Sequence, residues 1–238
     1  IYTDFIRSTH PNVKIFKYAD DMAIVGLLSF KDPDTSYPFF DAVQTFVDQC
    51  ASVNLLINAS KTKEMVVNFS RTYAIYDYIF ISGNPIERVS SFKYLGTFFD
   101  DNLKWQSNTD YIYGKLRQRF YAFSRFKHFR PNKQQRDYFI QSLIKPILLY
   151  NFELWYNYAT DKQKERLTKP FSQNNFDLDM DFYLESCVCK TAANFIADSS
   201  HVLHSCYQTN RKHYRAPKAN TNRFLDSFVP FSIRALNS

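Results

Sequence analysis

The sequence predicts an α+β fold, with antiparallel β-hairpins and a packed helix through about residue 104 and a helical module after it. Before residue 104, short runs rich in β-branched and aromatic residues alternate with turn signals, which is typical of hairpins. From residue 106 onward, apolar residues recur every three to four positions, which is typical of helices. These changes of pattern predict three segments, 1–104, 105–170 and a partly disordered extension over 171–238.

The first expected element is a β-hairpin with two carboxylates at its tip. Val13–Tyr18 and Met22–Leu27 are largely apolar, and only Ala19, Asp20 and Asp21 separate them. Adjacent residues of a regular strand point to opposite faces, whereas a tight turn can direct both aspartates to the same space. Two acids there repel each other unless a cation lies between them, and Mg²⁺ prefers carboxylate and phosphate oxygens. The alternative is an ordinary Asp-Asp turn, but the apolar flanks favour a central hairpin over a surface one.

Further short elements are expected before residue 104. A helix beginning at Ser36 and Pro38 would carry Phe39, Val43, Phe46, Val47 and Cys50 on one face. Gly83-Asn84 predicts a hairpin turn, and Gly96 would mark a bulge or a close backbone approach within a strand. The strands expected in this part are Asn54–Ile57, Met65–Phe69, Ile79–Ser82, Ile86–Val89 and Phe92–Phe99.

The helical half is expected to begin after residue 105. One stripe consists of Ile112, Leu116, Phe120 and Phe123, and a second helix should run from Asn132 to about Tyr158 with a kink at Pro146. The polar, acidic stretch 171–182 has the composition of a linker, and the last 35 residues show weak periodicity.

Positive charge is concentrated in the helical half. Residues 111–170 hold thirteen basic and four acidic side chains, whereas residues 1–60 hold four basic and seven acidic ones. Aromatic residues interleave with the densest run, and basic groups beside stacking side chains are expected of a surface that attracts a phosphate backbone. These aromatic residues are Phe120, Tyr121, Phe123, Phe126 and Phe129. A solvated helix face is the alternative. The basic residues of this run are Lys115, Arg117, Arg119, Arg125, Lys127 and Arg130.

Composition excludes several classes of protein. Four scattered glycines cannot form a dinucleotide-binding fingerprint or a phosphate-cradling loop, so nucleotide chemistry would depend on carboxylates and metals. The longest apolar run, Met22–Phe30, is about half of what a bilayer crossing needs, so no membrane is expected. Four cysteines are too few for a disulfide scaffold, which favours a reducing compartment. A zinc site in the C-terminal part is a weak hypothesis, since the Cys-x-Cys spacing is unusually tight. Its ligands would come from Cys187, Cys189, His201, His204, Cys206 and His213.

The order of motifs resembles the reverse transcriptases of non-LTR (LINE-type) retrotransposons. Phe16–Gly26, with Ala19-Asp20-Asp21 at its centre, is similar to the catalytic hairpin of that family. Leu56–Lys63 is similar to the next palm motif, and Phe92–Gly96 resembles the turn that grips the primer end, with Asp100 and 103–105 continuing the pattern. Residues 223–237 are similar to the end of many such reading frames, so the resemblance spans nearly the whole chain.

The resemblance implies a partial polymerase palm followed by a thumb-like helical module, in an intracellular protein, nuclear or cytoplasmic. Asp20 and Asp21 would bind Mg²⁺, or Mn²⁺ in its place, for a two-metal phosphoryl transfer. Lys61 would assist departure of pyrophosphate, although a solvated lysine is the alternative. The implied partners are an RNA template, a DNA primer and deoxynucleoside triphosphates, with the basic run of 115–130 holding the backbone. The implied primer-positioning residues are Phe92, Lys93, Tyr94, Leu95 and Gly96.

The chain departs from the family at its start. The family's third metal-binding aspartate and its fingers lie upstream of the hairpin, whereas Ile1–Asp4 resembles the stretch just after the preceding helix. A further polymerase segment is therefore expected upstream, and the chain by itself is expected to be inactive. The competing hypothesis is a non-enzymatic nucleic-acid-binding remnant of a retrotransposon protein.

Overall fold

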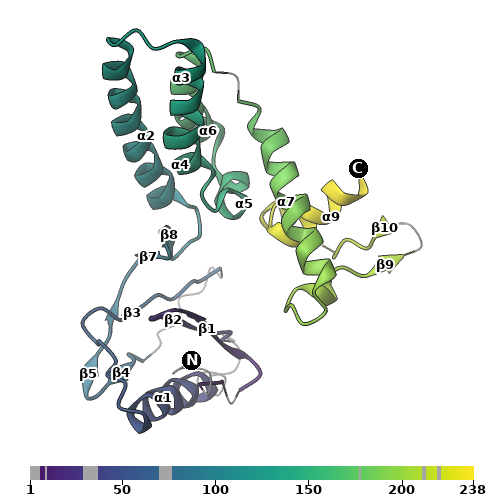
Figure 1. Cartoon of the computed structure of the whole chain (residues 1–238). Helices are drawn as coiled ribbons and strands as arrows, with labels where there is room; N and C mark the ends of the chain where they lie inside the picture. Colours follow the sequence, from purple (N-terminus) through teal and green to yellow (C-terminus); the bar gives the residue numbers. More distant parts are fainter. Residues whose placement is uncertain are drawn as a thin grey trace. The chain divides into compact units, whose positions relative to one another are not determined.

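The computed structural model describes residues 6–8, 10–28, 37–69, 77–176, 178–210, 213–218 and 221–238. The chain divides into two compact units, residues 1–103 (unit 1) and 104–238 (unit 2), which are considered separately below. The described residues combine helices with small antiparallel hairpins, so the predicted α+β class is confirmed (Figure 1). The Ile1–Asp4 stretch and the expected helix start at Ser36 lie outside the described residues.

The predicted hairpin is formed by β1 (Val13–Tyr18) and β2 (Asp21–Gly26). The strands pair antiparallel from Val13 opposite Gly26 to Tyr18 opposite Asp21. Ala19 and Asp20 alone connect them, the shortest common hairpin connection, and Ala19 takes a φ of 53° to close it. The second strand therefore begins at Asp21, one residue earlier than predicted.

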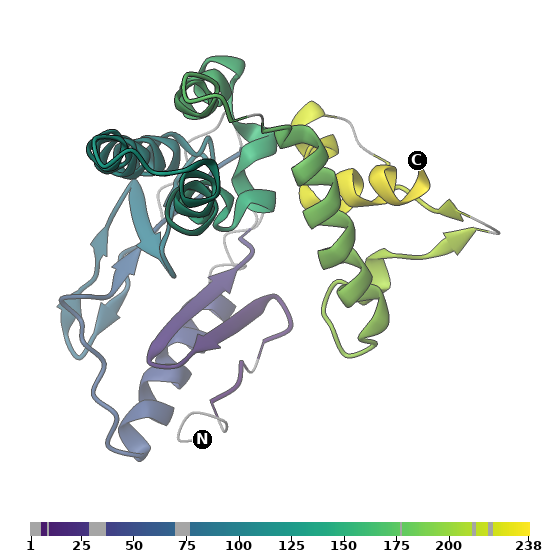
Figure 2. The ribbon, with the colours of Figure 1, turned by 45° about the horizontal axis from the view of Figure 1, so that its top comes forward.

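Helix α1 (Tyr37–Ser52) packs against one face of this hairpin (Figure 2). The alternation of β1 and β2 turns Ile15 and Ile24 toward a cluster around Phe46, which is 8% exposed. Gly26 is required at the contact, because a Cβ there would lie 2.3 Å from Cδ2 of the Phe39 ring. Helix and hairpin thus form one small core beneath the Asp20–Asp21 tip.

The remaining strands of unit 1 differ from the prediction. Asn54–Ile57 and Met65–Phe69 are not strands, and Leu56 is 98% exposed, so its apolar side chain has no sheet or helix to cover it. The strand of this region is β3 (Lys63–Glu64), which pairs parallel with β6 (Glu87–Arg88). Two hairpins follow, formed by β4 (Phe80–Ile81) with β5 (Asn84–Pro85) and by β7 (Ser91–Tyr94) with β8 (Thr97–Asp100).

Both later hairpins close through two residues with positive φ. Ser82 and Gly83 have φ of 50° and 77°, so the turn lies one residue before the predicted Gly83-Asn84. Leu95 and Gly96 have φ of 45° and 84°, values that match a type I′ turn. The prediction of a continuous strand through Gly96 is therefore wrong, because this glycine reverses the chain.

A half-buried ion pair joins β3 to β6. The Arg88 guanidinium donates to both carboxylate oxygens of Glu64, at 3.0 and 3.2 Å, and the Glu64 side chain is only 9% exposed. We expect Arg88→Met to lower the free energy of unfolding of unit 1 by about 2–3 kcal/mol, since it leaves a buried carboxylate unpaired. Lys63→Met is the control, because its partner Glu87 is 67% exposed and exposed pairs contribute less than about 1 kcal/mol. Hydrogen exchange of residues 77–100 measures both effects, and equal losses would contradict the expectation.

Unit 2 begins with α2 (Gln106–Lys127), whose buried residues include Ile112, Leu116 and Phe123 as predicted. The second predicted helix is interrupted rather than continuous. Pro146 lacks a backbone N–H and its ring crowds the preceding turn. A π-helical segment ends at Ile144, two residues before it, and Lys145 N–H donates to Ile140 O. The segments are α3 (Lys133–Phe139), η2 (Ile140–Ile144), α4 (Lys145–Leu149), α5 (Phe152–Trp155) and η3 (Tyr156–Tyr158).

The C-terminal part is more regular than its sequence indicates. Of the stretch 171–182 predicted as a linker, residues 171–172 end one helix and residues 180–182 begin the next. Ile233 and Tyr207 join Ala192 in a small cluster, where the Tyr207 and Ser232 hydroxyls hydrogen-bond at 2.8 Å. Among the described residues, no helix is long and apolar enough to cross a membrane. The elements are α6 (Asp161–Ser172), α7 (Met180–Ala197), η4 (His204–Cys206), β9 (Thr209–Asn210), β10 (His213–Tyr214), α8 (Asn222–Leu225) and α9 (Phe228–Asn237).

Candidate carboxylate site and nucleic-acid interface

Asp20 and Asp21 both lie exposed at the tip of the β1–β2 hairpin. Asp20 lies in the turn itself, and Asp21 is the first residue of β2, opposite Tyr18. Among the residues that the structure describes, no group of three His, Cys, Asp or Glu side chains could hold a metal ion. Two exposed carboxylates nevertheless fit Mg²⁺, which is commonly held by one or two carboxylates together with substrate phosphates and water.

The β7–β8 hairpin of unit 1 lies within electrostatic range of this tip. Burial, and after it the charge of Asp21, raises the pKa of the Tyr94 hydroxyl. Tyr94 ends β7 and belongs to the predicted primer-positioning turn, in which Lys93 is exposed with its ammonium 5.7 Å from the Phe98 ring. The structure therefore brings Asp21 and the 92–96 turn within electrostatic range, although they are more than 70 residues apart in the sequence.

Lys61 lies in a separate turn organised by Asn58. The Asn58 carboxamide oxygen accepts hydrogen bonds from Lys61 N–H at 3.1 Å and from Ser60 Oγ at 2.7 Å. The neighbouring Lys63 ammonium donates to Glu87 and to the Ser60 carbonyl, whereas the Lys61 side chain is exposed. Within the described part of the chain, Lys61 makes no ion pair with Asp20 or Asp21.

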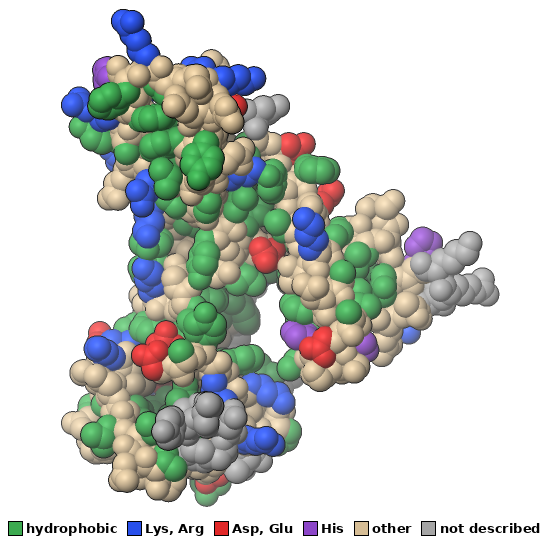
Figure 3. All heavy atoms as spheres, viewed as in Figure 1, with side chains coloured by type: hydrophobic (Ala, Val, Ile, Leu, Met, Phe, Trp, Pro, Cys, Tyr) green, Lys and Arg blue, Asp and Glu red, His purple; other side chains and the backbone are tan. Residues whose placement is uncertain are grey.

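The predicted basic residues of 115–130 are all exposed, along α2 and just beyond its end (Figure 3). Lys115 lies over the Tyr111 ring at 4.9 Å and Arg117 near the Tyr113 ring at 5.9 Å. Lys127 is more constrained, since its ammonium donates to Asn174 Oδ1 at 2.6 Å. The side chains able to reorient toward a phosphate are therefore mainly those before residue 127.

Most of the interleaved aromatic residues do not face solvent. Phe123 is 1% exposed and packs on Phe126, Phe139 and Phe176, and Phe120 lies edge-on to Phe171 at 5.0 Å. The prediction that these rings serve as stacking platforms is therefore wrong for Phe120, Phe123 and Phe126. The spacing of the apolar stripe explains why these rings pack inward, because it places Phe120 and Phe123 on the packed face of the helix. Only Tyr121 and Phe129 of this set, 69% and 83% exposed, remain available.

We expect Phe123→Ala to lower the free energy of unfolding of unit 2 by about 3–5 kcal/mol, because a buried ring is replaced by a cavity. Tyr121→Ala, on the opposite face of the same helix, should change it by less than about 0.5 kcal/mol. Thermal or urea unfolding followed by fluorescence of Trp105 and Trp155, both in unit 2, measures the two effects. A Phe123 variant as stable as the Tyr121 variant would contradict this packing.

One solvent-facing ridge of α2 combines charge with an exposed ring. Arg117, Tyr121 and Arg125 follow each other at four-residue spacing, which aligns them on one face over about 12 Å of helix. Gly114 lies at the start of this face, and nothing is within 4 Å of the position its Cβ would take. No packing contact in unit 2 therefore requires glycine there.

We expect Gly114→Ala to stabilise unit 2 by about 0.5–1 kcal/mol, because alanine removes backbone freedom from the unfolded chain and nothing obstructs its methyl group. Gly83→Ala is the opposite case, since the φ of 77° disfavours any side chain, and it should destabilise unit 1. Differential scanning calorimetry of both variants measures the changes, and a loss of stability in Gly114→Ala would contradict the geometry.

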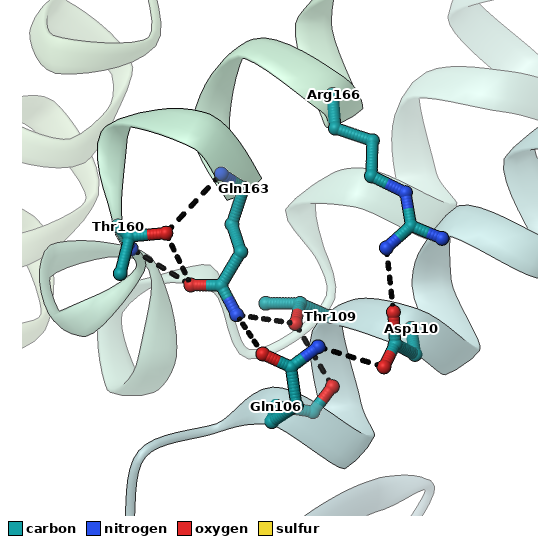
Figure 4. Close-up of polar contacts among 6 residues, drawn as sticks. All are labelled: Gln106, Thr109, Asp110, Thr160, Gln163 and Arg166. Atoms are coloured by element: carbon teal, nitrogen blue, oxygen red, sulfur yellow. Dashed lines mark hydrogen bonds and ion pairs between the residues drawn. The ribbon is translucent and has the colours of Figure 1, made fainter.

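A polar network fixes the first turns of α2 against α6 (Figure 4). The Gln163 amide nitrogen donates to Gln106 Oε1 at 2.6 Å and to Thr109 Oγ1 at 3.2 Å. Arg166 donates to Asp110 at 2.6 Å, and its guanidinium lies 3.8 Å from the Tyr113 ring centroid. The hydrogen bond from Gln106 and the Arg166 contact lower the pKa of the Asp110 carboxyl. The Asp110 carboxylate is thus paired with Arg166 within this network, and its negative charge offsets little of the basic charge of α2.

The cysteines and histidines of the C-terminal part make contacts that differ from those of a zinc site. The His201 ring stacks on Phe195 with centroids 3.9 Å apart, and His204 Nδ1 lies 3.2 Å from the Phe195 carbonyl oxygen. Burial raises the pKa of the Cys187 and Cys189 thiols, which disfavours the thiolate that zinc requires. The structure gives no support to the zinc alternative in the described residues.

No protein-family model, curated protein or solved structure matches this chain.

Proposed function

We propose that this chain is part of an RNA-directed DNA polymerase of the reverse-transcriptase type. The supporting observation is the β1–β2 tip, where two exposed carboxylates stand at a two-residue turn and Tyr94 of a second hairpin lies within range of the Asp21 charge. This matches the order in which the sequence resembles the family, with a catalytic hairpin first and a primer-gripping turn later. Bound Mg²⁺ would there stabilise the charge that develops on the transferred phosphoryl group.

The chain's own side chains have separate roles in this proposal. Asp20 and Asp21 hold the metal and so orient the triphosphate, and the 92–96 turn positions the primer end. The exposed Lys61 ammonium supplies a proton near the departing pyrophosphate. The basic face of α2 binds the phosphate backbone of the template and primer without reading sequence.

A second candidate is a nucleic-acid-binding protein without catalysis. The observation favouring it is that the basic face of α2 and the α6 network that fixes this helix both lie within unit 2. This candidate predicts salt-sensitive binding with little sequence preference and no metal-dependent chemistry.

Metal binding at the hairpin tip distinguishes the two candidates. We would add substoichiometric Mn²⁺, a paramagnetic substitute for Mg²⁺, to the ¹⁵N-labelled chain with and without a deoxynucleoside triphosphate. The proposal predicts selective broadening of the amide signals of 19–22, stronger with the triphosphate, and its loss in Asp20→Asn with Asp21→Asn. The control removes two exposed carboxylates elsewhere, Asp48→Asn with Glu165→Gln. Nucleic-acid binding without broadening at the tip would support the second candidate instead.

A further inference from the structure

A groove of about 560 Å³ runs along the free edge of β1, on the side away from β2. One wall is the approach segment, whose described residues 6–8 and 10–12 precede β1, and the other is the strand itself. The two walls are bridged at both ends, by Val13 N–H donating to His10 O at 3.2 Å and by Lys17 Nζ donating to Ile6 O at 3.0 Å. Ile6 is 1% exposed in the unit 1 core, so the approach segment is anchored.

Basic side chains gather at this groove. Arg7, Lys14 and Lys17 line it, and they are three of the four Lys and Arg residues among residues 1–60. Of the acidic residues of the same stretch that the structure describes, Asp20, Asp21, Asp41 and Asp48, none lines it. His10 also lines the groove, but its Nε2 lies 2.8 Å from Asp41 Oδ2 and is therefore already paired. An otherwise acidic stretch of chain thus places most of its positive charge at one groove.

The strand edge adds a backbone donor. Leu27 N–H donates to Asn12 O, so the hydrogen-bonded pairs of the hairpin include residue 12 with 27 and, by alternation, 14 with 25. The backbone groups of Val13 and Ile15 therefore point away from β2, as the outward bond from Val13 to His10 shows. The Ile15 N–H consequently faces the groove, whose lining also includes Arg7 and Lys14.

We propose that this groove binds a phosphate group. Arg7 and Lys14, both exposed, supply charge that can reach the anion, and the Ile15 N–H supplies a directed hydrogen bond. The phosphate would belong either to the backbone of a nucleic-acid strand or to a free nucleotide or inorganic phosphate. Asp20 and Asp21 do not line the groove, so the inference stands independently of the proposed polymerase activity.

Two titrations of the ¹⁵N-labelled full chain test the proposal and identify the source of the phosphate. One uses inorganic phosphate and the other an oligodeoxynucleotide of about eight nucleotides. Both follow the amide signals of Ser8, Lys14 and Ile15. Saturation by the oligonucleotide at concentrations at least tenfold below those of phosphate assigns the groove to a nucleic-acid strand, and equal concentrations assign it to free phosphate. Absence of shifts in these signals with both ligands would overturn the proposal.

A charge-removal variant gives the second readout. In Arg7→Gln with Lys14→Gln the groove signals should no longer respond to either ligand. If the ligand is a nucleic-acid strand, the slope of log K for its binding against log salt concentration should also fall by about 1.4. This is the value for two single-strand phosphate contacts. Lys162→Gln with Lys190→Gln, exposed lysines of α6 and α7, removes the same charge elsewhere. Groove shifts should also persist in Arg117→Gln, Arg119→Gln, Arg125→Gln, which separates this site from α2. Unchanged groove shifts in the Arg7 and Lys14 variant would overturn the proposal.

Discussion

Asp20→Asn with Asp21→Asn should reduce Mg²⁺-dependent primer extension by at least about 10³-fold, because losing metal-assisted charge stabilisation costs several kcal/mol in the transition state. Both residues are exposed at the hairpin tip, where the pairing of Tyr18 with Asp21 closes the turn through the backbone. Asparagine keeps the size and the local hydrogen-bonding ability of each side chain and removes only its charge. The measurement is extension of a DNA primer on an RNA template by this chain joined to the upstream segment that the resemblance implies.

Two controls make the result specific to the tip. Asp48→Asn with Glu165→Gln removes the same charge from exposed positions of α1 and α6, and extension should stay within about twofold of the unsubstituted protein, as is usual for surface substitutions. Binding of the template and primer should also be retained by the Asp20 and Asp21 variant, since α2 is unchanged. Undiminished extension by that variant would refute the polymerase assignment.

The elements that the sequence predicts best are those whose pattern is complete within a few residues. The β1–β2 hairpin is one, because apolar alternation on both sides of a short polar connection leaves a single register. The α2 stripe is another, since Ile112, Leu116 and Phe123 repeat at helical spacing. The strands expected at 54–57 and 65–69 fail because β-propensity measures fit to a half-buried surface, and Leu56 has no such surface to cover it.

In the candidate site, too, local features could be predicted from the sequence and contacts between elements could not. The tip with Asp20 and Asp21 is a local feature and could be predicted, whereas the approach of Tyr94 to Asp21 depends on how two hairpins pack and has no signature in spacing. The aromatic residues of 120–126 illustrate the opposite error. Their interleaving with arginines resembles a stacking surface, but helical periodicity places Phe120 and Phe123 inside and Tyr121 outside.

Arg117→Gln, Arg119→Gln, Arg125→Gln should lower nucleic-acid affinity steeply in a salt-dependent way. Three lost duplex phosphate contacts reduce the slope of log K against log salt concentration by about 2.7, which corresponds to roughly 500-fold weaker binding at 0.1 M salt if the proteins bind equally at 1 M. Lys127 is left in place, because its ammonium donates to Asn174 and its loss would disturb packing as well as charge. Fluorescence anisotropy with a labelled duplex over a series of salt concentrations measures the slope.

The control for this prediction is Lys162→Gln, Lys169→Gln, Lys190→Gln, which removes the same net charge from exposed positions of α6 and α7. A diffuse attraction between a protein of net charge +7 and any polyanion would weaken equally in both triple variants. Contact through the α2 face would weaken only in the first, and adding Tyr121→Ala to it should then weaken single-strand binding by a further 1–3 kcal/mol, about the value of one stacked base. Equal slopes in the two variants would show that net charge, rather than the α2 face, attracts nucleic acid.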